Sequence, residues 1–242
     1  MTTLTFLGTG NFQVQGRYWS NFLIDDTVLV ETSPTVLPHM RKLGIGAETI
    51  DAIVISHFHP DHTFGWPFLL LELMVAGRHR PLHVVGPPDT DGFFTEMMTL
   101  GGVDDVHTEV HRSVDMRYIE VNGDWQEAGS LRFRAVEVEH VPHLDCYGYL
   151  FERDDRVVGY SGDTHPCAGL DELVEAADVM VLECNGAHPW PTHMDIGSVA
   201  DLRTSFPDVP FVLTHVGGEV DADAVARIPD VTLPSDFERL EV

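Results

Sequence analysis

Basic residues are scarce in this sequence. Of the 242 residues, 14 are Lys or Arg and 39 are Asp or Glu, which gives a formal net charge of −25, and Lys42 is the only lysine. A chain this acidic repels the phosphates of DNA and RNA at long range, so a nucleic acid is an unlikely partner. We interpret the charge as a solvated acidic surface.

Cysteines and long apolar runs are also lacking. The three cysteines, Cys146, Cys167 and Cys184, have neither the even number nor the CxxC spacing of a disulfide or zinc framework, so we expect reduced thiols. No apolar run approaches the roughly 18 residues that a transmembrane helix needs. The N-terminus has no basic region typical of a secretory signal. These absences predict a cytoplasmic protein that does not contact a membrane.

The apolar pattern that is present predicts an α/β chain. No Pro/Gly/Ser-rich linker or repeat divides residues 1–242, so we expect a single domain. Helices are predicted over 34–43, 64–76, 91–99 and 196–205. Strands are predicted over 3–9, 21–31, 51–56, 82–88, 117–121, 131–139, 147–151, 157–160, 179–182 and 211–214. The strands 117–121 and 131–139 are expected to form a hairpin, and 102–115 has no readable pattern.

Several of these predicted strands end in a residue that can bind a metal or a proton. His140, Asp163, Glu183 and His215 each follow an apolar or alternating run. Side chains gathered from the ends of several strands are how α/β folds build one site. We therefore expect these residues to lie near one another.

The highest density of metal ligands is in the segment His57-Phe58-His59-Pro60-Asp61-His62, directly after the apolar run 51–56. Imidazole nitrogens and carboxylate oxygens together suit zinc, manganese or iron(II). A site for two ions needs about seven protein ligands. His140, Asp163 and His215 bring the ligands to that number.

With these residues in place, the sequence resembles the metallo-β-lactamase superfamily, whose signature is HxHxDH after a buried strand, then a lone His, a lone Asp and a final His. It is similar to the branch that contains the tRNA 3′ processing endonucleases, the arylsulfatase-like hydrolases and related phosphodiesterases. The likeness covers nearly the whole chain, and the matching segments are Thr5–Gly10, Gly86–Pro88, Ser161–Thr164 and Leu213–His215. It implies a four-layer αββα sandwich of two mixed β-sheets with flanking helices.

The resemblance implies two divalent metal ions per chain, with zinc as the default and manganese or iron also compatible. The ligands implied for the first ion are His57, His59, His140 and Asp163. Those implied for the second ion are Asp61, His62, Asp163 and His215. His143 is an alternative to His140, because it lies three residues further on. The other histidines, including His39, His79, His83, His107 and His111, are interpreted as ordinary surface or core residues.

His193 resembles a family histidine that opens a helix. In the family a Thr follows this His two residues later. Here Asp195 takes the place of that Thr, and Asp serves as a helix N-cap as well as Thr does. The resemblance implies that His193 stabilises charge or protonates the leaving group, whereas an exposed loop histidine is the alternative. Glu183 is either the residue that orients His193 or an ordinary strand-end carboxylate.

The predicted function is hydrolysis of a small ester by a metal-bridging hydroxide, with a phosphodiester favoured over a sulfate ester or lactone. Asp61 is expected to orient the water, and His193 to assist the leaving group.

One alternative is a tRNA 3′ processing endonuclease. The negative net charge opposes this activity. Long-arm nucleases also insert a basic tRNA-clamping segment between the residues equivalent to His140 and Asp163, whereas here only the short segment 141–162 separates them. A non-hydrolytic metal-binding or redox member is the other alternative. Members of this superfamily often dimerise, so the resemblance is compatible with a homodimer.

Overall fold

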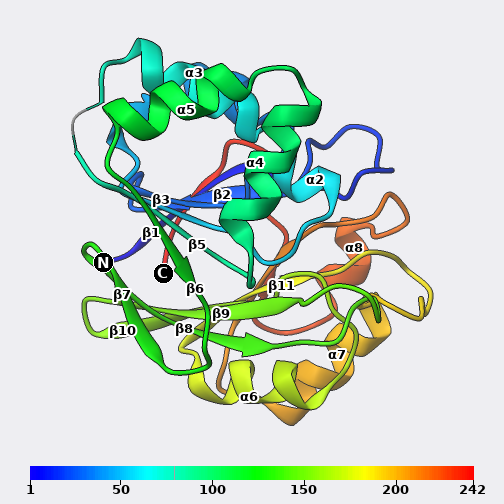
Figure 1. Cartoon of the computed structure of the whole chain (residues 1–242). Helices are drawn as coiled ribbons and strands as arrows, with labels where there is room; N and C mark the ends of the chain where they lie inside the picture. The colour runs from blue at the N-terminus through cyan, green and yellow to red at the C-terminus, as the bar shows by residue number, and fades with distance from the viewer. Residues whose placement is uncertain (79) are drawn as a thin grey trace.

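Two seven-stranded β-sheets pack face to face between two outer layers of helices (Figure 1). The computed structural model describes residues 1–78 and 80–242. Both sheets are mixed, because each contains parallel and antiparallel neighbours. The predicted four-layer αββα sandwich is confirmed.

The first sheet has the order β14-β1-β2-β3-β4-β5-β6. Its strands are β1 (Thr3–Gly8), β2 (Asn21–Ile24), β3 (Val28–Val30), β4 (Ala52–Val54), β5 (Leu82–Gly86), β6 (Met116–Glu120) and β14 (Arg239–Glu241). The single strand predicted over 21–31 is wrong, because β2 and β3 are the two arms of a hairpin. Asp25 and Asp26, with φ of 51° and 53°, form its turn. Aspartate adopts this left-handed conformation more readily than most residues.

The second sheet has the order β13-β12-β11-β10-β9-β8-β7. Its strands are β7 (Trp125–Ala128), β8 (Leu131–Glu137), β9 (Tyr147–Arg153), β10 (Arg156–Tyr160), β11 (Val179–Glu183), β12 (Phe211–Thr214) and β13 (Val231–Thr232). The hairpin predicted between 117–121 and 131–139 is wrong. β6 instead pairs in parallel with β5, and β8 pairs with β7, so the chain crosses between the sheets after β6. An alternating pattern specifies a strand and its buried face but does not name its partner.

Helices cover the outer face of each sheet. The first sheet carries α1 (Val36–Lys42), α3 (Trp66–Val75), α4 (Thr90–Leu100) and α5 (Asp104–Ser113), and the second carries α6 (Ala168–Ala176), α7 (Ile196–Ser205) and α8 (Ala222–Val225). Among the described residues, the short helices α2 (Pro60–Thr63) and η1 (Ala47–Thr49) complete the helical segments. Asp195 caps α7 as predicted, since its carboxylate accepts from the N–H groups of Gly197 and Ser198.

The helices differ from the predictions at several places, and the short helices α2, α8 and η1 were not predicted. α1 begins at Val36 rather than at Pro34, because the Ser33 hydroxyl bonds to Asn21 instead of capping the helix. α5 lies in the stretch 102–115 that had no readable pattern. α6 was not predicted, although its buried residues Leu170, Leu173 and Val174 have helical spacing.

The apolar core between the sheets combines aliphatic side chains with several large aromatic ones. Phe6, Phe22, Phe133, Tyr149 and Phe151 are fully buried there. Burying each such side chain is worth about 1.5–3 kcal/mol, so the sandwich is a rigid support for the loops at its edges. Among the residues that the structure describes, no helix combines the length and apolarity needed to cross a membrane. The three cysteines are free thiols.

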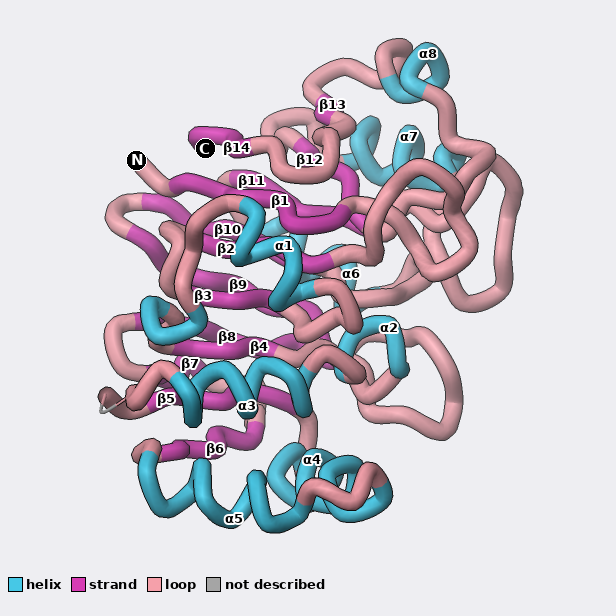
Figure 2. Tube along the Cα trace, turned by 90° about the horizontal axis from the view of Figure 1, so that it is seen from above, coloured by secondary structure: helices cyan, strands magenta, loops and turns pink. Residues whose placement is uncertain are grey.

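The strand directions bring the predicted site residues to one edge. β10, β11 and β12 run parallel, and β8 runs with them because both β8 and β10 are antiparallel to β9. The residues that follow these strands therefore leave the second sheet on one side. In the first sheet β3, β4 and β5 are likewise parallel. Figure 2 shows α2 and the long loops gathered at one end of the strands.

Candidate metal centre

Four side chains from three separate segments meet in one cluster. They are His57, His59, His140 and Asp163, whose ligand atoms all lie within 4.8 Å of one another. His57 Nε2 is 2.9 Å from His59 Nδ1, which is 3.3 Å from His140 Nε2. Ring nitrogens that face a common point in this way have the arrangement of ligands around one ion.

The outer nitrogens of two of these rings are held by neighbours. His140 Nδ1 is 2.8 Å from the carbonyl oxygen of Thr192, and His57 Nδ1 is 2.9 Å from Ser56 Oγ. Because a carbonyl only accepts, His140 Nδ1 carries the proton, and Nε2 keeps a lone pair for a metal. Burial lowers the pKa of His140 to about 4 and that of His57 well below its usual value. Neutral imidazole is the form that binds metals.

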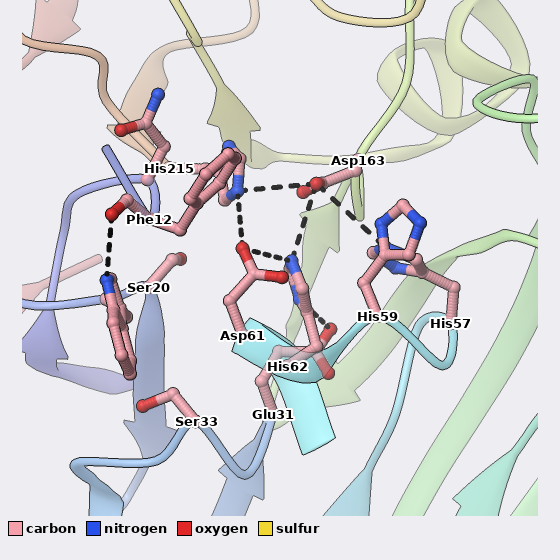
Figure 3. A network of polar contacts seen from close by, with 12 residues as sticks. Phe12, Ser20, Glu31, Ser33, His57, His59, Asp61, His62, Asp163 and His215 are labelled. Carbon is pink, nitrogen blue, oxygen red and sulfur yellow. Dashed lines mark hydrogen bonds and ion pairs between the residues drawn. The ribbon is translucent and has the colours of Figure 1, made fainter. Parts of the chain in front are cut away.

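Asp61, His62 and His215 form a second cluster beside the first. Asp61 Oδ2 is 3.4 Å from His215 Nε2. Asp163 Oδ2 is 3.4 Å from His62 Nε2, 3.3 Å from His215 Nε2 and 4.0 Å from His57 Nε2 (Figure 3). Asp163 therefore borders both clusters, in the position of a carboxylate that two ions share.

The polar atoms of this site fit divalent cations. His62 Nε2, which faces Asp61 and Asp163, and Asp163 Oδ1 are buried without a hydrogen-bond partner in the described part of the chain. An unsatisfied buried polar group costs about 1–3 kcal/mol, and coordination removes that cost for a ligand atom. Burial by itself would raise the pKa of Asp61, but His62 and His215 hold it below its usual range. The carboxylate is thus in the charged form that binds a cation, and the mixed imidazole and carboxylate set suits zinc, manganese or iron.

Glu31 is a buried residue of this site that the sequence reasoning missed. It follows β3 with φ of 66°, and its carboxylate accepts from the Ser56 N–H at 3.2 Å and the Tyr160 hydroxyl at 3.0 Å. Its Oε1 is also 3.5 Å from His62 Nδ1 (Figure 3). Glu31 thus faces the ring edge of His62 opposite the cluster. An acidic residue directly after an apolar strand was the signal that could have found it.

His193 lies beside both clusters and is paired with Glu183. His193 Nδ1 is 2.9 Å from Glu183 Oε1 and 4.0 Å from Asp163 Oδ2, and its ring lies 4.7 Å from that of His140. The predicted hydrogen bond between Glu183 and His193 is present, and the orienting role of Glu183 stays a prediction. Burial by itself lowers the pKa of His193, but the hydrogen bond and the charge of Glu183 outweigh it, so the pKa is raised.

The other histidines that the structure describes lie outside these clusters. His143 is exposed, and His140 rather than His143 lies in the cluster with His57, His59 and Asp163. His39 packs against Tyr18 at a ring distance of 4.2 Å. His79 lies outside the described residues. His107 and His111 form a group of their own with Asp91.

An apolar pocket of about 470 Å³ adjoins the clusters. Its lining consists of Phe12, Trp19, Pro34, His59, Pro60, Asp61 and Phe64. His59 and Asp61 thus form part of its wall and also belong to the two ligand clusters. An organic group bound in this pocket would lie next to the proposed metals.

Comparisons with known proteins agree with this architecture. A family model described as "Anti-Pycsar protein Apyc1" matches residues 2–226. A Ribonuclease Z from Methanosarcina acetivorans is 26% identical over 306 aligned positions, which span 100% of this chain and 98% of that protein. A Ribonuclease Z from Mycobacterium bovis is 27% identical over 195 positions, covering 75% of this chain and 69% of that protein.

Solved structures with a similar fold include the metallo-β-lactamase fold protein YhfI from Bacillus subtilis, with a TM-score of 0.80 and 21% identity over 100% of both chains. A diphosphatase from the PhnP family has a TM-score of 0.76 and 21% identity, covering 100% of this chain and 98% of that one. The short form of human tRNase Z has a TM-score of 0.75 and 20% identity, covering 99% and 98%. These likenesses show the metallo-β-lactamase fold.

Proposed function

Because the chain belongs to the anti-Pycsar protein Apyc1 family and is a metal-dependent hydrolase acting on ester bonds, we propose that its substrate is a small phosphodiester. The observation that carries this proposal is Asp163, whose Oδ2 borders two clusters of imidazole and carboxylate ligands. A pair of ions that share a carboxylate is the usual arrangement for displacement at phosphorus. The sequence-based expectation of a sulfate ester or lactone is kept as a competing outcome.

The proposed ligands follow the two clusters. For the first ion they are His57, His59, His140 and Asp163. For the second ion they are Asp61, His62, Asp163 and His215. When bound, two such cations lower the pKa of a water and stabilise negative charge on the phosphoryl oxygens. Zinc is the proposed metal, and manganese or iron would bind the same donor set.

Two residues would handle protons. Asp61 is ionised, lines the apolar pocket and lies 3.4 Å from His215, so its carboxylate can orient the attacking water and accept its proton. His193 is held by Glu183 through Nδ1, which leaves Nε2 as the atom that can donate to the leaving oxygen. Its raised pKa favours the protonated form that a general acid needs.

The pocket supports a small substrate with an apolar or aromatic group. Phe12, Trp19 and Phe64 provide flat apolar surface next to Asp61. Among the residues lining this pocket there is no lysine or arginine that would pair with further phosphates. A compact diester with one organic group in the pocket fits this lining better than a polyanion does.

A tRNA 3′ processing endonuclease is the second candidate, because the relatives named above include Ribonuclease Z proteins. The formal net charge of −25 opposes binding of an extended RNA. We therefore rank this activity second. A cytoplasmic location and a homodimer stay predictions.

The test is a substrate panel with the metal-loaded protein. We expect turnover of bis(p-nitrophenyl) phosphate that exceeds turnover of phenyl sulfate and of a lactone, no processing of a tRNA precursor, and no turnover by Asp61→Ala. Loss of activity with a chelator and recovery with zinc would support the metal requirement. Activity that survives metal removal, or a preference for the tRNA precursor, would contradict the proposal.

A further inference from the structure

A third group of metal-type ligands lies in the outer helical layer of the first sheet. It consists of Asp91 in the first turn of α4 and of His107 and His111 in α5, and one ligand atom of each lies within 4.8 Å of the others. Figure 1 shows α4 and α5 together in this layer. None of these residues belongs to the metal centre described above.

The two histidines are placed to bind one ion together. They are four residues apart, so they share one face of α5, and their ring centroids lie 4.0 Å apart. Two histidines at this helical spacing are a recurrent zinc-binding pair. Asp91 Oδ1 adds a carboxylate, 3.9 Å from His111 Nε2.

Each ring offers a nitrogen lone pair that an ion could take. His111 Nδ1 is 2.8 Å from the carbonyl oxygen of His107, and because that oxygen only accepts, the proton lies on Nδ1 and the lone pair on Nε2. His107 is 8% exposed, and its Nε2 is buried without a partner in the described part of the chain. A buried imidazole nitrogen next to a histidine and a carboxylate, with nothing to bond, points to an ion as its partner.

We propose that Asp91, His107 and His111 bind a third divalent cation of the zinc class. Water would complete the tetrahedral coordination. The Tyr118 hydroxyl lies 3.2 Å from His111 Nε2, and burial together with the nearby charge of Asp91 raises the pKa of this hydroxyl. With an ion on Nε2, this hydroxyl would be available to donate to Asp91 and orient its carboxylate, as residues around metal ligands commonly do.

The ion would be structural. It joins the first turn of α4 to α5, and the Tyr118 hydroxyl connects the site to β6. An ion that binds the folded chain and not the unfolded chain raises the stability of the fold in proportion to its occupancy. The site is separate from the apolar pocket and from Asp163, so phosphodiester hydrolysis should not depend on it.

The test compares zinc content in four forms of the whole protein after equilibration with excess ZnCl₂ and removal of free ion. Asp91→Asn and His111→Gln each remove one ligand with little change in shape. Glu96→Gln, which removes an exposed charge from the same helix α4, is the matched control. Elemental analysis gives the zinc per chain, and thermal unfolding with and without ZnCl₂ gives the stabilisation.

We expect the unsubstituted protein and Glu96→Gln to hold one zinc ion per chain more than Asp91→Asn and His111→Gln. Added zinc should also raise the unfolding midpoint of the unsubstituted protein and of Glu96→Gln by more than it raises the midpoints of Asp91→Asn and His111→Gln. Equal zinc content in all four proteins would overturn the proposal. A parallel loss of zinc and phosphodiesterase activity would also overturn it, because the lost ion would then belong to the catalytic centre.

Discussion

Glu183 Oε1 lies 2.9 Å from His193 Nδ1, and the same oxygen accepts from the Thr164 N–H at 2.6 Å. Glu183 ends β11 and is fully buried, whereas His193 comes from the loop before α7. A loop histidine is thus fixed by a carboxylate that the sheet holds in place. This relationship separates the role of His193 from the roles of the proposed metal ligands and gives the first two predictions.

Replacing His193 should lower turnover without removing metal. A general acid contributes about 10²–10⁴-fold, so His193→Ala should lose activity within that range on a diester with a poor leaving group. The loss should be smaller with p-nitrophenolate, which leaves without protonation. Kinetics on both substrates and elemental analysis check this. A variant with less bound metal than the unsubstituted protein would instead identify His193 as a ligand.

Replacing Glu183 should shift the pH profile. Glu183 raises the pKa of His193, and the protonated imidazole is the active form, so activity falls as the pH rises through that pKa. Glu183→Gln keeps an acceptor and removes the charge, so the alkaline limb of kcat should move to lower pH while metal content stays the same. An unchanged limb together with a lower rate at every pH would show that Glu183 has only a structural role.

The choice between His140 and His143 can be tested directly. His140 Nε2 faces His59 Nδ1 at 3.3 Å, whereas His143 is exposed. We expect His140→Ala to bind less metal and to lose activity by about 10²-fold or more, because a ligand of the first ion is gone. His143→Ala is the matched control and should keep both metal content and rate. The reverse pattern would reassign the ligand.

The sequence predicted the clustering of the proposed ligands best where these residues are close together in the chain. His57, His59, Asp61 and His62 lie within six residues, so their own spacing places them together whatever the rest of the fold does. The direction of the strands then explains why His215 and other strand-end residues join them. This step needs only parallel strands, which apolar runs such as β4 and β11 indicate.

The sequence could not predict features that depend on partners distant in the chain. The alternating pattern of 117–121 indicates a strand, but the neighbour of β6 is set by the crossover between the sheets. α5 had no readable pattern because a histidine, His107, occupies its buried face beside Val110. Glu31 carries no motif, and its role follows only from its contacts with Ser56 and Tyr160.

Glu31 gives the last prediction, because it contacts a proposed ligand but is not one itself. Its carboxylate faces His62 Nδ1 at 3.5 Å and so can hold the ring with Nε2 toward Asp61 and Asp163. Loss of such a supporting residue typically weakens metal binding about 10–100-fold.

Glu31→Gln keeps the acceptor for Ser56 and Tyr160, so the fold should be retained, but it removes the charge that faces His62. We expect one of the two ions to bind about 10–100-fold more weakly, and excess metal to restore the rate. Metal titrations followed by activity and by elemental analysis measure this, with the exposed Glu96→Gln as the control. A loss of rate that excess metal does not restore would show that Glu31 acts on the chemistry rather than on the orientation of His62.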